Sequence, residues 1–512
     1  MRSLTLLFFL LCLLPLAAQP GTTTLHLDRP YHAAGEVSWF RAYLPQPAPA
    51  SVRAEIYGPD GQRLDYFFLG TTDGAADGYY RWGYDLPTGY YRIVLTALSA
   101  DGQDVHLGTF RHAVYSVGDR GTTPTETVAA ASPLGATNLS VRVEDGTLRL
   151  SDAPAGTYSL SVFNASVVGD RAGETVAAEP VRPAAAYQDT LFYRGQVTAA
   201  DGGEAVAVNL LPVFDGTTFA TYFSKSDPQG RFLLTVPAFE GQKTVQARDI
   251  SGSTALVARL GQPRLESLAE RPPLTEAVVA YLELSYRRRK IFQLYRTVET
   301  PLEAEPVREQ RRPLVPSKAY NVQDYKAFPD LYTFFREVAG ELRYRERRGS
   351  YTARLYNAPT QRFFLEAPLF IVDGRLTRDA DYVARLDPAE VDRLTFYYGN
   401  RELREQFPAL GNQGVVQIDR LRPADDLPAA DAANLLTLNG RQPALGFRPL
   451  PAALPRISPL LLWQTGTTEG GAVSLPLPGT DDSGSYRVVV LLRDATGRQW
   501  LGTTTFTLDA SR

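Results

Sequence analysis

The sequence predicts a mainly β, multidomain protein that consists of several antiparallel β-sandwiches and one small α/β domain. A turn marked by glycine, followed by an aromatic residue at the head of a strand, recurs near Gly89, Gly156, Gly230 and Gly484. Apolar residues alternate along the segments beside these turns, which is the period of half-buried strands. The segment 368–399 differs, because its pattern predicts strand, tight turn, short strand, helix and strand in succession.

Residues 1–19 have the organisation of a secretory signal peptide. Arg2 precedes an apolar run (4–14), and the small, turn-prone sequence PLAAQP follows. We expect cleavage near Ala18 or Gln19 and therefore an exported protein. The apolar run is too short to span a bilayer, so the mature chain is expected to be peripheral rather than transmembrane.

The composition restricts the chemistry of the mature chain. Cys12 is the single cysteine and lies in the leader, so no disulfide, thiol nucleophile or thiolate metal site is expected. The 512 residues, of which 44% are apolar and 11% aromatic, can form three to five domains with their own cores. The formal net charge of -3 argues against nucleic acid as a partner.

Three β-sandwiches are expected in the first half of the chain. The first, 20–116, has strands that alternate around a turn at Pro30 and Gly35. The second, 134–186, is short. The third, 188–262, contains the strand and turn phrases YRGQVTAADGGEAVAVNLL and SKSDPQGRFLLTV.

A helix and a linker follow the third sandwich. The segment 272–297 contains helix formers and an apolar stripe at helical spacing. The segment 298–316 is charged and interrupted by four prolines, which predicts an extended linker. A last sandwich is expected at 425–512. The apolar stripe of the helix comprises Val278, Tyr281, Leu282, Phe292 and Tyr295.

The α/β domain is predicted at 317–422. Residues 369–372 form a buried strand, and Asp373-Gly374 supplies a hairpin turn. In LDPAEVDRL, Asp387 is the expected N-cap of a helix, with proline and glutamate at the positions that favour a helix start. The phrase NQGVVQIDRL supplies the last strand.

Parts of the sequence resemble known families. LDRPYHAAGEVSWFRAYL resembles the opening of macroglobulin-type domains, and the third sandwich resembles the carboxypeptidase-regulatory-like domain. The IVDG hairpin, the DPAEV segment and the GVVQI strand resemble the plug domain of TonB-dependent outer-membrane receptors. Together these domains resemble large exported proteins of Gram-negative bacteria, which implies a location in the periplasm or at the outer membrane.

A complete receptor is not expected from the length of this sequence. About ninety residues follow the plug-like domain, whereas transporter barrels have about twenty-two strands of roughly nine to eleven residues each. We therefore expect a plug-like domain without its barrel. Its resemblance implies an envelope protein as partner, with an outer-membrane barrel as one candidate, and a link to TonB-dependent transport.

No catalytic residue, cofactor-binding residue or metal ligand is predicted, and no cofactor is expected. The four histidines are His26, His32, His106 and His112, without a His-Glu-x-x-His motif. HLDRPYH could bring His26, Asp28 and His32 together around a metal ion, but ordinary surface or strand histidines are the favoured interpretation. In RDADY, Asp379 and Asp381 are interpreted as a solvated turn rather than as a cation site.

Two surfaces are candidate binding sites. Tyr80, Trp82 and Tyr84 fall on one face of a predicted strand and are interpreted as core, which leaves Tyr79 and Tyr90 as candidates for exposure. The basic run RRRK at 287–290 could contact acidic lipid head groups or an acidic partner. A solvated helix face is the favoured interpretation of that run.

Three function classes remain from the sequence. The first is a non-catalytic, modular envelope protein that acts through protein contacts at or near the outer membrane. The second is a glycan-binding protein that uses the aromatic sandwich face. The third is a hydrolase with carboxylates assembled between domains.

Overall fold

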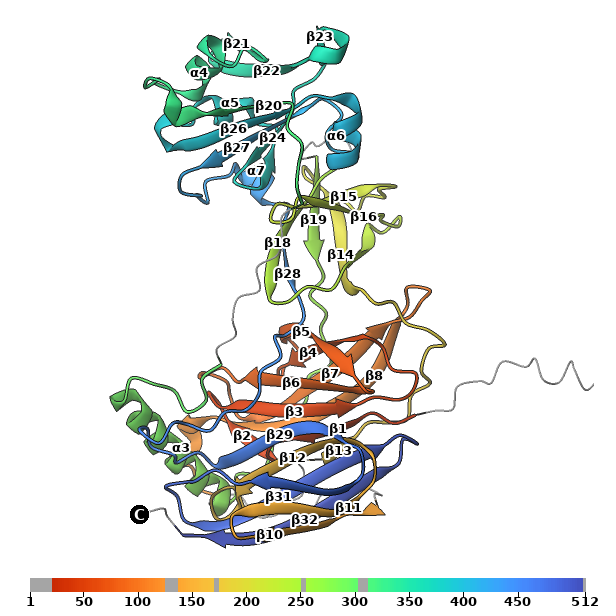
Figure 1. Ribbon diagram of the computed structural model, residues 1–512, viewed down its shortest axis with the longest axis vertical. Coiled ribbons are helices and arrows are strands. Elements are labelled where there is room, and N and C mark those ends of the chain that lie inside the picture. Colours follow the sequence, from red (N-terminus) through yellow and green to blue (C-terminus); the bar gives the residue numbers. More distant parts are fainter. Residues whose placement is uncertain (1–20, 125–136, 170–174, 250–254, 303–311, 510–512) are drawn as a thin grey trace, which may run out of the picture. The chain divides into compact units, whose positions relative to one another are not determined.

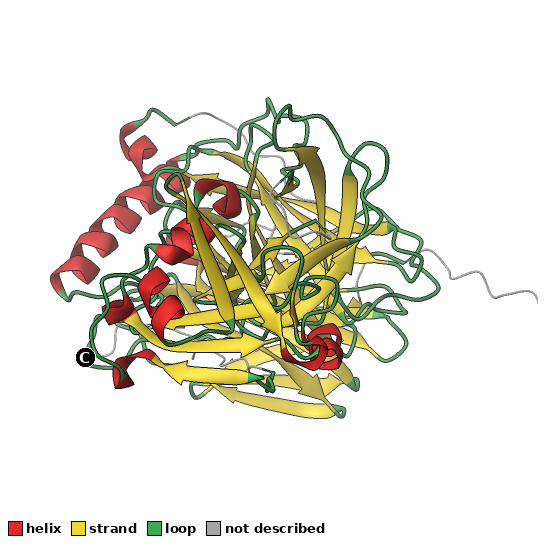
Figure 2. Cartoon of the chain, turned by 90° about the horizontal axis from the view of Figure 1, so that it is seen from above, coloured by secondary structure: helices red, strands yellow, loops and turns green. Residues whose placement is uncertain are grey.

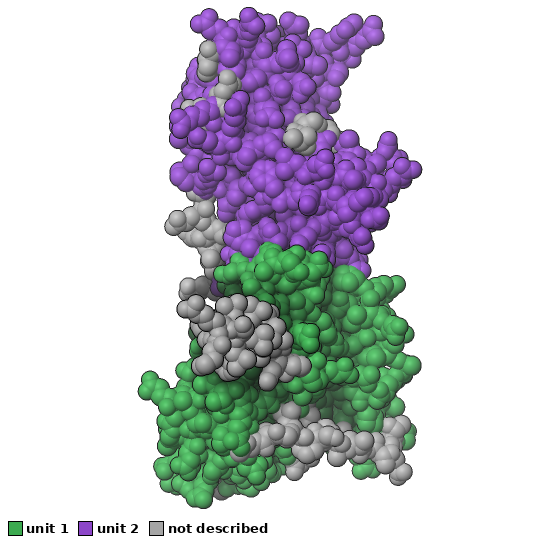
Figure 3. Space-filling view, turned by 90° about the vertical axis from the view of Figure 1, so that its right-hand side faces the viewer, with its two compact units in different colours: residues 1–189, 263–305, 441–512 green, residues 190–262, 306–440 purple. Residues whose placement is uncertain are grey.

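The computed structural model describes residues 21–124, 137–169, 175–249, 255–302 and 312–509 (Figure 1). The protein is mainly β, as Figure 2 shows, and the chain divides into two compact units (Figure 3). Unit 1 contains 1–189, 263–305 and 441–512, and unit 2 contains 190–262 and 306–440. The predicted signal peptide lies outside the described residues. Within the described residues, no helix is long and apolar enough to cross a membrane.

The first sandwich of unit 1 is one nine-stranded sheet that bends around a core. The order of its strands is β13-β1-β3-β6-β5-β4-β7-β8-β2. Strand β5 pairs with β4 and, at its end, with β6, so it belongs to both faces. The strands are β1 (Thr24–Leu27), β2 (Tyr31–Ala33), β3 (Val37–Tyr43), β4 (Ser51–Tyr57), β5 (Arg63–Thr72), β6 (Ala75–Arg81), β7 (Gly89–Leu98), β8 (Asp104–Tyr115) and β13 (Thr175–Ala177).

The second sandwich of unit 1 combines two distant parts of the chain. Strand β12 pairs with β29 on one side and with β31 on the other, so 134–186 and 425–512 do not form the two separate sandwiches that the sequence predicts. A few short strands cannot bury a core alone, and β12 is buried at nearly every position. The strands are β9 (Thr137–Asn138), β10 (Ser140–Glu144), β11 (Thr147–Ala153), β12 (Gly156–Asn164), β29 (Leu460–Thr468), β30 (Gly471–Pro476), β31 (Gly484–Asp494) and β32 (Gln499–Leu508).

Unit 1 also contains the predicted helix. Helix α3 (Glu276–Leu294) begins at Thr275, whose side chain accepts a hydrogen bond from the backbone N–H of Val278. Four of the five predicted stripe residues are buried, but Tyr295 is 52% exposed because the helix has already ended there. The shorter helices of this unit are α2 (Ala165–Val168) and the 3₁₀ turn η1 (Val117–Gly121).

Unit 2 begins with a sandwich of two sheets, ordered β17-β14-β19 and β16-β15-β18-β28. Strand β28 was expected in the last sandwich of the chain, but it pairs with β18 and buries Leu436 and Leu438 here. The strands are β14 (Leu191–Ala199), β15 (Leu211–Asp215), β16 (Ala220–Ser224), β17 (Arg231–Val236), β18 (Gln242–Ala247), β19 (Leu256–Leu260) and β28 (Leu435–Asn439); α7 (Ala429–Ala432) precedes β28.

The α/β domain of unit 2 contains a five-stranded sheet, ordered β20-β26-β27-β24-β25, in which β24 and β27 are parallel. Helices α4 and α5 contact a smaller sheet of order β21-β22-β23. One core contains residues from both sheets and both helices. The elements are β20 (Lys318–Asn321), η2 (Val322–Asp324), α4 (Leu331–Glu337), β21 (Leu342–Arg347), β22 (Ser350–Asn357), η3 (Ala358–Thr360), β23 (Arg362–Phe363), β24 (Leu369–Val372), β25 (Arg375–Thr377), α5 (Ala380–Ala384), η4 (Pro388–Glu390), β26 (Val391–Tyr397), α6 (Asn400–Gln406) and β27 (Val415–Arg420).

The turn and the cap predicted for the α/β domain have different outcomes. Asp373 and Gly374 form the turn between β24 and β25 with φ values of 48° and 81°, which confirms the predicted hairpin. Asp387 caps only a 3₁₀ turn, because β26 begins directly at the buried residue Val391. The helix lies earlier, where Asp379 caps α5 in the segment interpreted as a solvated turn.

Candidate functional site

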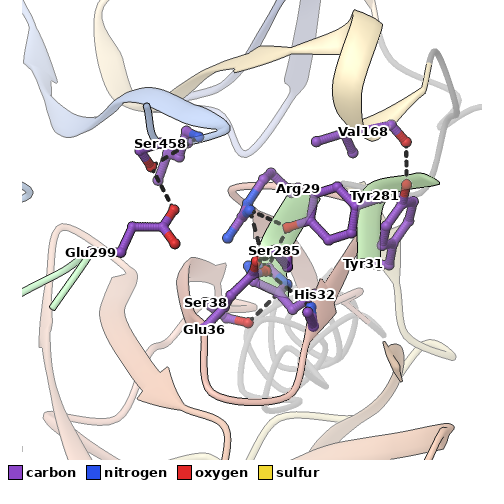
Figure 4. A network of polar contacts seen from close by, with 12 residues as sticks. Arg29, Tyr31, His32, Glu36, Ser38, Val168, Tyr281, Ser285, Glu299 and Ser458 are labelled. Atoms are coloured by element: carbon purple, nitrogen blue, oxygen red, sulfur yellow. Dashed lines mark hydrogen bonds and ion pairs between the residues drawn. The ribbon is translucent and has the colours of Figure 1, made fainter. Parts of the chain in front are cut away.

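A buried carboxylate, Glu36, is the centre of a polar network in unit 1 (Figure 4). It lies in the turn between β2 and β3, and its side chain is 5% exposed. Burial alone would raise its pKa, but Arg29 and Arg288 outweigh burial and hold the pKa of Glu36 at about 2. Its carboxylate accepts hydrogen bonds from Tyr281 Oη at 2.5 Å, Ser285 Oγ at 2.8 Å, Arg288 Nη2 at 3.2 Å and the backbone N–H of Ala33 at 2.9 Å.

Arg29 joins Glu36 to a second buried carboxylate. Its Nη1 donates to Tyr281 Oη at 2.8 Å, and its Nε donates to Asp28 at 3.3 Å. Asp28 also accepts from the backbone N–H of Trp39 at 3.1 Å and lies 3.1 Å from Nε2 of His32. Charges buried to this extent are tolerated when each has partners, so the network fixes the positions of its own members.

Helix α3 contributes three of these partners through its period. Tyr281, Ser285 and Arg288 are spaced by four and three residues, so they share one helix face and turn toward Glu36. The interpretation of 287–290 as a solvated face is therefore wrong for Arg288, which is 5% exposed. Its neighbour Arg287 is exposed and pairs with Glu283 at 2.9 Å. The sequence signal for the burial of Arg288 is the spacing of polar residues along the apolar stripe of the helix.

A small pocket of about 100 Å³ adjoins the network. Its wall includes Tyr84, Arg289 and Phe292, and the Arg289 guanidinium lies over the Tyr84 ring at 5.0 Å. The Nη2 atom of Arg289 is buried and has no hydrogen-bond partner within the described residues. Gly35 leaves room for both side chains, because a Cβ atom there would lie 2.6 Å from the Tyr84 ring and 2.7 Å from Arg289 Nη2.

Two further groups of the pocket are already paired. Arg81 donates to the backbone carbonyl of Thr300, and Glu299 accepts from Ser458 Oγ at 3.0 Å. Burial raises the pKa of Glu299 against the opposing effect of Arg288, so this carboxyl holds its proton more tightly than usual. Within the part of the chain that the structure describes, the pocket thus presents the unpaired Nη2 donor of Arg289 beside two aromatic rings, an arrangement suited to a carboxylate.

The histidines do not assemble a metal site in the described residues. His32 contacts Asp28, but His26 is directed elsewhere, with Nδ1 2.7 Å from Ser159 Oγ. No group of three potential ligands occurs within the described ranges. The favoured interpretation as surface or strand histidines is confirmed: all four lie in strands, and His106 is exposed. The other three are buried, since His26 and His32 are 0% exposed and His112 is 2% exposed. Burial lowers the pKa of all three histidines, that of His26 to about 3.

The aromatic residues of the first sandwich are only partly arranged as predicted. Trp82 is fully buried in the core, and Tyr80 packs against that core, but Tyr84 is 53% exposed at the pocket. Tyr84 follows the end of β6, so the alternation of the strand no longer determines its direction. Tyr79 and Tyr90 are half-buried, and Tyr79 packs against a tryptophan ring rather than facing solvent fully.

The two aspartates of the segment RDADY have structural partners. Asp379 accepts a hydrogen bond from the backbone N–H of Tyr382 as the N-cap of α5. Asp381 accepts from Ser350 Oγ at 3.2 Å and from the backbone N–H of Tyr351. These contacts connect α5 to β22.

Comparisons with known proteins give remote likenesses. No protein-family model matches the chain, and no curated protein matches it. A crystal structure of Salmonella alpha-2-macroglobulin reacted with methylamine has 10% identity and a TM-score of 0.23, over 96% of this chain and 40% of that one. Escherichia coli alpha-2-macroglobulin activated by porcine elastase has 11% identity and a TM-score of 0.24, over 95% and 43%.

A tetra-tandem repeat from the extending region of a large adhesion protein has 12% identity and a TM-score of 0.14, over 96% of this chain and 99% of that one. This chain spans less than half the length of the two macroglobulins. At such identities and scores these likenesses assign neither a family nor a function to the chain.

Proposed function

We propose that this chain is a non-catalytic, modular protein of the bacterial envelope that acts by holding another envelope protein. The observation that carries the proposal is the buried Nη2 atom of Arg289, which lacks an acceptor within the described residues. It lies at the wall of a pocket in which Arg81 and Glu299 are already paired. A buried donor without a partner costs about 1–3 kcal/mol. A carboxylate from a partner would recover this free energy.

The size of the pocket favours part of a macromolecule over a free small molecule. Sites for drug-sized ligands enclose about 300–1,000 Å³, several times the volume found here. About 100 Å³ accommodates an acidic side chain or a terminal carboxylate. Tyr84 and Phe292 would cover the apolar carbons next to that carboxylate, while Arg289 receives its charge.

The expected export of the chain and the plug-like sequence of its α/β domain suggest where the partner resides. The proposed partner is therefore an envelope protein, with an outer-membrane barrel as the first candidate. A more specific form of this proposal links the chain to TonB-dependent transport. The glycan-binding alternative depends on aromatic residues outside the predicted core, with Tyr79 and Tyr90 as the candidates for exposure. Because both are half-buried and Tyr79 packs against Trp39, we do not extend that alternative to this face.

Photo-crosslinking in intact cells tests the proposal. A photoreactive amino acid in place of Tyr84 should capture a protein partner, because this side chain is 53% exposed at the pocket. Arg289→Ala should reduce capture by at least about tenfold, the loss expected for a buried charged hydrogen bond. Arg287→Ala is the matched control on the same helix and should leave capture unchanged, since Arg287 faces solvent. Equal capture by all three proteins would contradict the pocket as the recognition site.

A further inference from the structure

The outer face of the sheet β21-β22-β23 in unit 2 carries a dense array of arginines. Along β21, Arg343, Arg345 and Arg347 are exposed, as is Glu346, while Leu342 and Tyr344 are buried in the domain core. Alternate residues of a strand share one face and lie about 6.8 Å apart. The three guanidiniums therefore extend in a row on the solvent side of the sheet, away from α4 and α5.

Strand β22 adds a fourth cation to the same face. Arg354 lies directly opposite Arg343 in the antiparallel register and is also exposed. Like charges in directly opposite positions destabilise a sheet. The acidic residue of this hairpin, Glu346, belongs to the other set of alternating positions and pairs in register with Tyr351. Stability of the hairpin thus does not explain why this face is cationic.

These arginines have no ion pairs in the part of the chain that the structure describes, whereas some exposed arginines elsewhere do. Arg111 pairs with Glu270, and Arg401 pairs with Glu405. On the hairpin, the contact found is between Arg343 and the ring of Phe363, at 4.2 Å. The guanidinium donors remain available to an external anion.

Apolar groups border the cationic face. Phe363 pairs in register with Tyr356, and their rings lie 5.2 Å apart. Leu365, two residues further along the chain, is 79% exposed. A plane of guanidiniums with an exposed apolar side chain beside it is the combination that peripheral proteins present to phosphate head groups and the acyl boundary beneath them.

We propose that this face, defined by Arg343, Arg345, Arg347 and Arg354, docks onto the surface of an anionic phospholipid membrane. The charges are spread along two paired strands and do not converge on a pocket, so they match a surface of many head groups better than a single anion. Arginine forms bidentate hydrogen bonds with phosphate, and the segment 342–363 contains no lysine. The inference does not depend on the Arg289 pocket, which belongs to unit 1.

Vesicle cosedimentation with the full mature chain tests the proposal. The chain should bind phosphatidylcholine vesicles that contain phosphatidylglycerol and should not bind phosphatidylcholine alone, and added salt should release it. Replacing the four arginines with glutamine should weaken binding by about a hundredfold or more, since each cation near an anionic surface contributes about fivefold. Unchanged circular dichroism will show that the quadruple variant is folded.

A second quadruple variant controls for net charge. Replacing Arg111, Arg149, Arg231 and Arg401 with glutamine removes the same charge from exposed positions that already have acidic partners. This variant should keep vesicle binding within about twofold of the unmodified chain. An equal loss in both variants would overturn the proposal, as would equal binding to neutral vesicles. Binding to heparin without binding to vesicles would identify an acidic polysaccharide as the partner and refute the membrane.

Discussion

Two arginine-rich segments of this protein have similar composition but different structural roles. In the run 287–290, a helix turns successive residues by about 100°, so Arg288 points into unit 1 while Arg287 remains in solvent. In the run 343–347, a strand alternates its side chains, so all three arginines point outward. The period of the local structure, rather than the number of charges, determines whether a cation is buried.

The difference separates a structural role from a binding role. Arg288 has lost its water, and Glu36 compensates for that loss. The arginines of β21 keep their water and have no such partner among the described residues. Removing charge from the first group should therefore reduce stability, and removing it from the second should reduce binding. The following predictions test this division.

The largest effect is expected from Glu36→Gln. The substitution keeps the shape of the side chain but removes the carboxylate charge that Arg29 and Arg288 share. Among the described residues, Arg29 then keeps only Asp28 as an acidic partner. Arg288 keeps only Glu299, at 3.9 Å. Breaking one partner of a buried ion pair costs about 3–5 kcal/mol. Urea unfolding followed by tryptophan fluorescence will measure the loss in unit 1 specifically, because all four tryptophans belong to that unit.

Glu283→Gln on α3 is the control for this prediction. Glu283 pairs with Arg287 in an exposed i, i+4 arrangement, which contributes about 0.3–0.5 kcal/mol. Similar losses of unfolding free energy in the two variants would show that the network around Glu36 stabilises α3 no more than a surface ion pair does.

The stability of unit 1 should depend on pH more strongly than that of unit 2. In the folded state burial lowers the pKa of His26, His32 and His112, so below about pH 6.5 the unfolded chain binds more protons than the folded chain. Above that pH these histidines are neutral in both states, so they do not reduce the free energy of unfolding. Below it, the free energy of unfolding of unit 1 should decrease on acidification by about 1.4 kcal/mol per pH unit for each histidine.

Unit 2 supplies the internal comparison for this prediction. All four histidines belong to unit 1, so hydrogen exchange in unit 2 should report nearly constant stability between about pH 7 and 5.5. The raised pKa of Glu299 has the opposite effect, because it stabilises the folded state of unit 1 as the pH falls. This is one group against three histidines, so the net stability should still decrease. His112→Phe should reduce the slope for unit 1 by about one proton, and an unchanged slope would refute the assignment to buried histidines.

A smaller effect is expected from alanine at the glycines of two hairpin turns. Gly349 and Gly374 have φ values of 78° and 81°, so a side chain at either position costs about 1 kcal/mol. At Gly374, a Cβ atom would also lie 2.9 Å from the carbonyl oxygen of Gly216, whereas Gly349 has open space. Gly374→Ala should therefore destabilise unit 2 more than Gly349→Ala, as hydrogen exchange of the domain core will show.

The parts of the fold that the sequence predicts are those governed by local chemistry. The turn at Asp373-Gly374 and the helix at 276–294 follow from residue type and period. The pairing of β12 with β29 and β31 does not, because nothing within a strand identifies a partner about three hundred residues away. The polar network around Glu36 could not be predicted from the sequence for the same reason. Glu36 and Arg288 each look ordinary in sequence, and only packing makes them partners.

The smallest expected effect has the opposite sign. Arg354→Thr removes one of two directly opposite cations on β22 and β21, so relief of repulsion should stabilise the hairpin by about 0.2–1 kcal/mol. Arg345→Thr is the matched control, because its opposite residue is Thr352 and no cation pair is relieved. Hydrogen exchange of the peptide 342–357 will compare the two variants. A loss of stability in Arg354→Thr would mean that the guanidinium contributes to folding, and the division between structural and binding arginines would then fail at this position.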